Sequence, residues 1–153
     1  MTLVKASIDI DAPREKVYDL VLDPARLDEW VTIHRRVNSR DDGSPREGFE
    51  MNQTLHLRGA NFRVSWTLTE AERPDHATWE GRGPAHSYAR TSYGLRELDG
   101  GRTRFEYENE FKAPGGFLGA AASRMLIGGV PEREARRSLE RLKALLENGK
   151  GAG

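Results

Sequence analysis

The sequence predicts an α+β fold: a curved antiparallel sheet of about seven strands, two short helices after strand 1, and a long C-terminal helix across the concave face. Three observations support this prediction. Residues 4–30 contain one alternating segment and two short helical segments, residues 31–111 alternate with a period of two, and the pattern beyond residue 116 is helical. Consecutive strands joined by short turns favour an antiparallel meander. The apolar face of such a sheet needs a cover, and only the C-terminal helix is long enough to provide it.

The opening segment sets the order strand, helix, helix. Apolar and polar residues alternate over 4–10, which is typical of a half-buried strand. Pro13 suits the first turn of a helix because its missing N–H is not needed there, and Pro24 restarts the chain after that helix. Apolar residues at helical spacing give the first helix a buried face. We expect four side chains of the two helices to close one end of the sheet: Val17, Leu20, Leu27 and Trp30.

Turn residues divide the middle of the chain into strands. The clearest strand covers 62–69, where Phe, Val, Trp and Leu alternate with Arg, Ser and Thr. The sequence Asp99-Gly100-Gly101 is a strong signal for a hairpin between the last two strands. The other expected strands are 31–37, 49–57, 77–83, 89–95 and 104–111.

Beyond these strands the period becomes helical. The pattern is amphipathic from Glu132 onward, whereas residues 117–127 are almost wholly apolar. Gly128, Gly129 and Pro131 should kink or briefly break the helix. The apolar half has three interpretations: a gate over an internal cavity, a segment buried on all sides, or a surface that packs against a second subunit.

Composition limits the classes of function. The chain has 153 residues, and we expect a single domain over 1–148 with a disordered tail over 149–153. Lys plus Arg and Asp plus Glu both number 24, and this balance argues against nucleic acid as a partner. The chain has no cysteine, which excludes disulfides and thiolate chemistry.

The sequence also suggests where the protein works. Met1 leads directly into an alternating strand without the apolar core of a signal peptide, so a cytoplasmic location is expected. The most apolar stretch, residues 115–131, is short for a membrane span and carries Arg124 at its middle, so no transmembrane segment is expected. We expect a monomer or a homodimer.

Four segments carry a resemblance to a known family. They are Ile8-Asp-Ile-Asp-Ala-Pro-Arg-Glu-Lys-Val17, Asp23-Pro24 with Trp30, Gly101-Arg-Thr-Arg-Phe105 and Ser138-Leu-Glu-Arg-Leu-Lys-Ala-Leu-Leu-Glu147. Over nearly its whole length the chain resembles the START-like or SRPBCC superfamily, also called the birch-pollen-allergen-like group. Within it the chain is most similar to bacterial polyketide cyclase/dehydrase and lipid-transport proteins. The resemblance implies a helix-grip fold with an internal apolar cavity. That fold serves lipid carriers, aromatase/cyclases, hormone receptors, quinone-binding proteins and chaperone cofactors, so it does not identify a ligand.

Aromatic residues dominate the inner side of the predicted strands. Large flat side chains suit a planar or polycyclic apolar ligand, and they also suit a filled core. We favour a cavity, because so many aromatic side chains on a concave face would pack poorly without voids. The predicted ligand contacts are Phe49, Met51, Trp66, Trp79, Tyr93, Phe105, Tyr107, Asn109, Phe117 and Met125.

Polar residues on the same side could orient a ligand or transfer a proton. A buried Asn109 needs a hydrogen-bond partner, either a ligand or a structural group. Tyr93 and Tyr107 either hold a ligand oxygen, donate a proton, or place their hydroxyl groups at the rim. His86 begins a strand near the expected mouth of the cavity. The two tyrosines and His86 are the candidate catalytic residues.

Strand parity sorts the remaining polar candidates. It places Gln53 and Arg35 on the inner face, Gln53 as a further ligand contact and Arg35 either paired with an acidic ligand group or exposed at the rim. It places His34 and His56 on the outer face, where both should meet solvent. The histidines lack metal-ligand spacing and the chain lacks a nucleotide-binding motif, so neither a metal nor a cofactor is expected.

Three functions fit these features. The leading hypothesis is the binding or carriage of an apolar small molecule, lipid-like or aromatic and polyketide-like, in an internal cavity. The alternative from the enzyme class is a polyketide aromatase/cyclase or dehydratase that uses the same cavity to confine a folded substrate. The third is a protein-interaction module, similar to a chaperone cofactor, that uses the outer face of the sheet.

Overall fold

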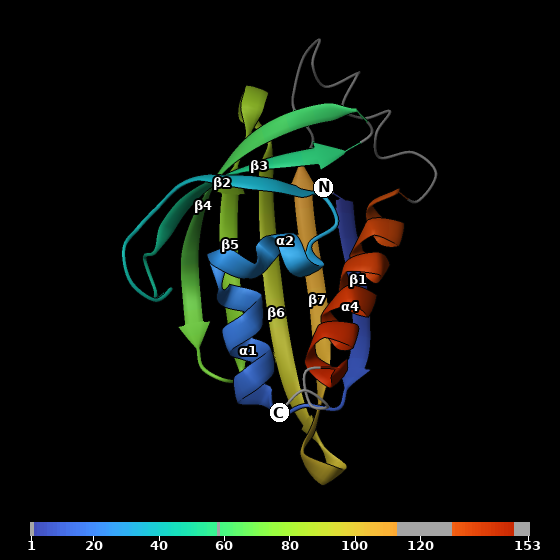
Figure 1. Cartoon of the computed structure of the whole chain (residues 1–153). Coiled ribbons are helices and arrows are strands. Elements are labelled where there is room, and N and C mark those ends of the chain that lie inside the picture. Colours follow the sequence, from blue (N-terminus) through green and yellow to red (C-terminus); the bar gives the residue numbers. More distant parts are fainter. Residues whose placement is uncertain (1, 58, 113–129, 149–153) are drawn as a thin grey trace.

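The computed structural model describes residues 2–57, 59–112 and 130–148 (Figure 1). The α-helices are α1 (Arg14–Leu22), α2 (Leu27–Trp30) and α4 (Val130–Asn148). One-turn 3₁₀ helices cover Pro24–Arg26, Pro84–His86 and Asp99–Gly101. The strands are β1 (Thr2–Ile10), β2 (His34–Arg40), β3 (Glu50–Leu57), β4 (Ala60–Glu72), β5 (His76–Arg82), β6 (Tyr88–Leu98) and β7 (Arg102–Lys112).

The strands form one antiparallel sheet in the order β1-β7-β6-β5-β4-β3-β2. Strands β2 to β7 are thus a meander, and β1 joins it beside β7. The sheet is curved, and α1, α2 and α4 all lie on one side of it (Figure 1). The predicted helix-grip α+β fold is confirmed.

Prolines mark the start of the first two helical segments: Pro13, expected in the first turn, is the N-cap residue of α1, and Pro24 begins the 3₁₀ turn before α2. The main-chain N–H groups of Lys16 and Val17 donate hydrogen bonds to the Pro13 carbonyl oxygen, at 3.1 and 3.2 Å. The Asp23 side chain accepts a hydrogen bond from Ala25 N at 3.0 Å and so caps the turn that begins at Pro24. These bonds satisfy N–H groups that a helix start would otherwise leave without partners.

The core lies between the sheet and the helices. Val17, Leu20, Leu27 and Trp30 are all buried, and their closing of one end of the sheet stays a prediction. Helix α4 adds one apolar face, buried through Ala135, Leu139 and Leu142. The apolar stretch 117–127, with the predicted ligand contacts Phe117 and Met125, lies outside the described residues, as does the predicted tail 149–153.

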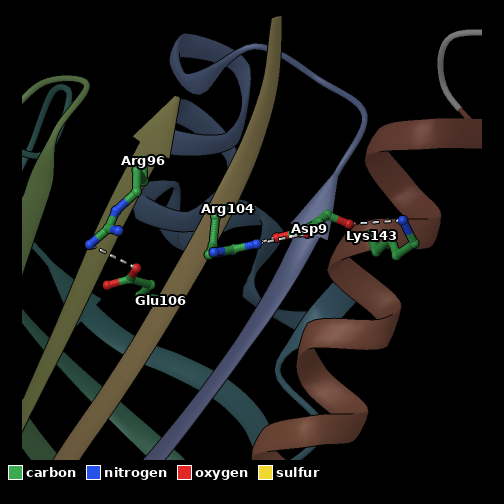
Figure 2. A network of polar contacts seen from close by, with 5 residues as sticks. All are labelled: Asp9, Arg96, Arg104, Glu106 and Lys143. Carbon is green, nitrogen blue, oxygen red and sulfur yellow. Dashed lines mark hydrogen bonds and ion pairs between the residues drawn. The ribbon is translucent and has the colours of Figure 1, made fainter. Parts of the chain in front are cut away.

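Polar contacts fasten α4 to β1 at the end of the sheet that the C-terminal half of the helix reaches. Lys143 Nζ donates a hydrogen bond of 2.8 Å to the main-chain carbonyl oxygen of Asp9 (Figure 2). The side chain of Asp9 pairs with Arg104 of β7, with Arg104 Nε 2.8 Å from Asp9 Oδ1. The main-chain N–H of Asp11 donates to Glu147 Oε2 at 2.9 Å. Helix α4 is therefore held in register with β1, and this fixes which of its side chains face the sheet.

Candidate ligand-binding cavity

A cavity of about 280 Å³ lies between the inner face of the sheet, α2 and α4. This volume is close to the lower end of the range for small-molecule sites, about 300–1,000 Å³. Its wall is mainly apolar, and all three tryptophans of the chain line it: Trp30, Trp66 and Trp79. The site therefore suits a compact apolar ligand.

Six of the residues predicted as ligand contacts form part of the cavity wall: Met51, Trp66, Trp79, Tyr93, Tyr107 and Asn109. Phe49 and Phe105 do not, because they lie in the core behind it, 1% and 0% exposed. Phe49 packs edge-to-face against Trp79, and Phe105 packs edge-to-face against Trp30. The structure thus separates residues of the cavity wall from residues of the core, which strand parity alone could not distinguish. Binding of a ligand by any of these residues stays a prediction.

Two tyrosines form a continuous aromatic wall across β6 and β7. Tyr93 and Tyr107 are cross-strand partners whose rings stack with centroids 6.2 Å apart. Burial raises the pKa of Tyr107 to about 12, against a side-chain hydrogen bond with Asn109 that lowers the pKa. Burial also raises the pKa of Tyr93, and the neighbouring Tyr107 adds to the increase. Both hydroxyls therefore keep their protons near neutral pH and act as hydrogen-bond donors, not as bases.

Asn109 faces the cavity and already has a structural partner. Thr91 Oγ1, on the neighbouring strand β6, donates to Asn109 Oδ1 at 3.1 Å. The amide nitrogen of Asn109 remains for Tyr107 and for a ligand. Asn109 can thus orient a ligand together with Tyr107.

Gln53 is the most deeply buried polar residue of the cavity wall, at 4% exposure. Trp66 Nε1 donates to Gln53 Oε1 at 2.9 Å. Gln53 Nε2 lies 2.7 Å from His34 Nδ1. Three adjacent strands, β2, β3 and β4, thus share one chain of hydrogen bonds.

The predicted orientation of His34 is wrong. A β-bulge between His34 and Arg36 shifts the register of β2 against β3, and this shift turns His34 toward Gln53. Arg35 is exposed. Burial lowers the pKa of His34, although the carboxylate of Asp28 acts in the opposite direction. A bulge changes strand parity by one residue, and the sequence of β2 contains no signal for it.

His86 is exposed in the 3₁₀ turn between β5 and β6. The cavity wall includes its neighbours Pro84 and Ser87 but not His86 itself. Ala85 and His86 both adopt positive φ, 51° and 62°, which is uncommon for residues other than glycine. His86, expected near the mouth of the cavity, is therefore exposed in this turn and is not part of the described cavity wall.

A polar cluster at one edge of the cavity is not evident from the sequence. Thr32 N donates to Ser138 Oγ at 3.1 Å, and Thr32 Oγ1 donates to the carboxylate of Glu134. All three residues line the cavity and connect the end of α2 with α4. The helical pattern gives Ser138 a place on α4, but the rotation of α4 against the sheet decides that it faces Thr32.

Neither a metal-binding cluster nor a membrane-spanning helix occurs among the described residues. In this part of the chain no three His, Asp or Glu side chains are grouped so that they could hold a metal ion. None of the helices in the same residues is long and apolar enough to span a membrane.

Comparisons with known proteins agree with this fold. Two Mycobacterium tuberculosis proteins are similar in sequence. The uncharacterised protein Rv1546 is 27% identical over 131 residues, covering 85% of this chain and 92% of the relative. The toxin Rv0910 is 28% identical over 83 residues, covering 54% of this chain and 58% of the relative.

Solved structures with the same architecture include the Zhui aromatase/cyclase of Streptomyces sp. R1128 and the hypothetical protein jhp0584 of Helicobacter pylori. The first has a TM-score of 0.75 at 17% identity, over 95% of this chain and 93% of that chain. The second has a TM-score of 0.75 at 15% identity, over 95% and 88%. At these identities the likeness shows the fold alone.

The family model described as polyketide cyclase / dehydrase and lipid transport matches residues 1–147. This match covers all the described strands and helices except the last residue of α4. The chain therefore belongs to the polyketide cyclase/dehydrase and lipid transport family, within the START-like superfamily.

Proposed function

We propose that this protein binds and carries a compact, flat, apolar small molecule in the cavity between the sheet and α4. The observation that supports the proposal most strongly is that the wall is apolar and contains all three tryptophans and the Tyr93–Tyr107 pair. Burial of ligand surface would drive binding, at about 25 cal/mol per Å² of apolar area. Tyr93, Tyr107 and Asn109 would orient the ligand by hydrogen bonds.

A polyketide aromatase/cyclase or dehydratase is the second candidate, because two tyrosine hydroxyls lie on the cavity wall. Cyclisation by an aldol route needs a base to remove a proton from carbon and an acid to assist the loss of water. Tyr93 and Tyr107 have raised pKa values and can serve only as acids near neutral pH. The carboxylate of Glu134 accepts a hydrogen bond from Thr32 at the edge of the cavity. The wall thus supplies two acids, while its carboxylate lies at the edge and is hydrogen-bonded to Thr32. Ligand binding therefore accounts for more of the wall residues than catalysis does.

A protein-interaction module fits the outer face least well. Cross-strand ion pairs cover that face, including Lys5–Glu108 and Arg96–Glu106, the second of which Figure 2 shows. Among the described residues only Leu3 is a large hydrophobic residue with a strongly exposed side chain. Such a face lacks the apolar patch that protein docking generally uses.

The tryptophans provide a built-in reporter for ligand binding. Acetylnaphthalene is a suitable probe because it is flat, apolar and carries one carbonyl group. A probe that enters the cavity should quench the fluorescence of all three tryptophans in a saturable manner. Ala89→Phe should block this response, because Ala89 lines the cavity and a phenyl ring would occupy part of its volume.

Arg90→Phe is the matched control, because it adds the same ring to the adjacent exposed position. The proposal predicts saturable quenching in the wild type and in Arg90→Phe, with at least tenfold weaker binding in Ala89→Phe. Equal quenching in all three proteins, or no response in the wild type, would contradict it.

A further inference from the structure

The hydrogen-bond chain Trp66–Gln53–His34 allows only one arrangement of donors and acceptors. An indole nitrogen can only donate, so the Gln53 oxygen must face Trp66. The Gln53 amide nitrogen then faces His34 Nδ1. An amide nitrogen can also only donate, so His34 Nδ1 must be the acceptor. His34 is therefore neutral and carries its proton on Nε2.

Gln53 lines the cavity and keeps hydrogen-bonding capacity that the described residues do not use. Its amide nitrogen has two hydrogens, and the described residues provide a partner, His34, for one of them. Its oxygen already accepts from Trp66, and a carbonyl oxygen with one partner is common in buried sites. A buried N–H without a partner is rare and unfavourable. The group that best completes the site is therefore a hydrogen-bond acceptor on the ligand.

We propose that Gln53, oriented by Trp66 and by neutral His34, is the specificity-determining residue of the cavity and selects aromatic ligands that carry a carbonyl-type acceptor over the matching hydrocarbons. This inference rests on the proposed function, because it concerns which ligand the same cavity prefers. Gln53 meets the ligand directly, whereas His34 and Trp66 are positioning residues that act through it.

The charge state of His34 controls this selection. Among the described elements, β3 and α2 make the main contacts with β2. Helix α2 contributes Asp28, whose charge favours the imidazolium, while β3 places the apolar Leu55 opposite His34. A proton on Nδ1 would put two donors 2.7 Å apart and break the contact with Gln53. The Gln53 amide would then keep only its bond from Trp66, it would no longer be held in one orientation, and the preference for an acceptor would be lost in acid.

The experiment compares acetylnaphthalene with isopropenylnaphthalene, which has the same shape but a CH₂ group in place of the carbonyl oxygen. Tryptophan quenching gives a dissociation constant for each probe. At pH 8 the wild type should bind the ketone roughly three- to tenfold more tightly, the effect of one buried hydrogen bond. Gln53→Leu should bind the two probes equally, with the affinity for the hydrocarbon retained.

A pH series tests His34 without removing Gln53, so it remains informative if Gln53→Leu does not fold. The preference of the wild type should disappear as the pH falls below the usual imidazole range, about 6.5. His34→Asn should keep the preference at every pH, because its amide oxygen takes the place of Nδ1 and does not titrate. His76→Asn, at an exposed histidine on β5, should behave like the wild type.

The outcomes separate this inference from the proposed function. If both probes bind the wild type equally, or if His34→Asn loses the preference in acid as the wild type does, the role of Gln53 and His34 is wrong while the cavity still binds apolar ligands. If neither probe changes the tryptophan fluorescence, the proposed function fails and the inference fails with it.

Discussion

The indole ring of Trp66 lies so close to Gly81 that a Cβ atom on Gly81 would stand 2.7 Å from the indole carbons Cε3 and Cζ3. The two residues are cross-strand partners on β4 and β5. The missing side chain lets Trp66 lie against β5 while its N–H reaches Gln53. Gly81 therefore positions both the aromatic wall and the polar group of the cavity.

Gly81→Ala should displace Trp66 and also Val64, whose Cγ1 would lie 2.7 Å from the new Cβ, and destabilise the protein by about 1–3 kcal/mol, as other overpacked cores do. It should also weaken the binding of acetylnaphthalene, because the displaced indole would enter the cavity. The control is Gly94→Ala, whose new methyl group would meet its nearest neighbour, Glu106 Cβ, at an ordinary 3.7 Å. Urea unfolding of the three proteins measures the difference. A stability loss of equal size in both variants would show that Trp66 is not constrained by Gly81.

Thr103 fastens the turn between β1 and α1. Its Oγ1 donates to the Ala12 carbonyl oxygen at 2.7 Å, and Thr103 is 0% exposed. Thr103→Val keeps the shape but removes the donor, so it should lower the free energy of unfolding by about 1–3 kcal/mol. Thr103→Ser keeps the hydroxyl and should recover that hydrogen bond, with a smaller loss from the missing methyl group. If valine proves more stable than serine in chemical denaturation, packing and not the hydrogen bond holds this turn.

The ion pair between Asp9 and Arg104 makes stability depend on pH in acid (Figure 2). The hydrogen bond from Arg104 lowers the pKa of Asp9 in the folded protein. A lowered pKa stabilises the folded state above the ordinary value of about 3.9, and this contribution is lost as the pH falls through the folded-state value. The urea concentration at the unfolding midpoint of the wild type should thus decrease as the pH is lowered from about 5 to 3. The decrease should be modest because the pair is exposed.

Asp9→Asn should flatten this part of the pH profile. The control is Asp42→Asn in the loop between β2 and β3, an exposed side chain that forms no ion pair with any described residue. That variant should follow the wild type. Parallel profiles for wild type and Asp9→Asn would mean that the pair with Arg104 contributes nothing to folding.

The raised pKa of Tyr107 predicts that stability also depends on pH in alkaline solution. Because its pKa is raised to about 12 in the folded protein, its contribution to stability is complete below about pH 10 and is lost as the pH rises through 12. Ultraviolet titration of phenolate should show late ionisation in the native protein and normal ionisation near pH 10 in urea. Tyr107→Phe should remove one late-titrating group, and titration of all four tyrosines near pH 10 in the native state would contradict the burial of this pair.

The strands, and the meander of β2 to β7, were predictable because their signals are local, whereas the pairing of β1 with β7 joins the two ends of the sheet sequence and has no local signal. Alternation over 62–69 predicts β4, and Asp99-Gly100-Gly101 predicts the connection of β6 with β7, where the structure has a 3₁₀ turn. The inward direction of Tyr93, Tyr107 and Asn109 follows from the same alternation. Prolines 13 and 24 likewise predict where the first helices begin.

The hydrogen bonds that join the polar residues of the cavity were not predictable, because they depend on registers between strands. The Trp66–Gln53 contact requires the pairing of β3 with β4, and the contact with His34 requires a bulge in β2. Gly81 did carry a signal, because a glycine inside a strand often marks a close approach of another group. The pairing of Thr32 with Ser138 depends on the rotation of α4, which no local pattern determines.

The central claim is that the cavity holds an apolar small molecule, and native mass spectrometry of the protein purified from its own organism tests this most directly. The account predicts a bound small molecule on the wild type that is released on denaturation and is absent from Ala89→Phe prepared in the same way. A wild-type protein that carries no bound molecule under the mildest ionisation conditions, or an equal adduct on Ala89→Phe, would contradict it.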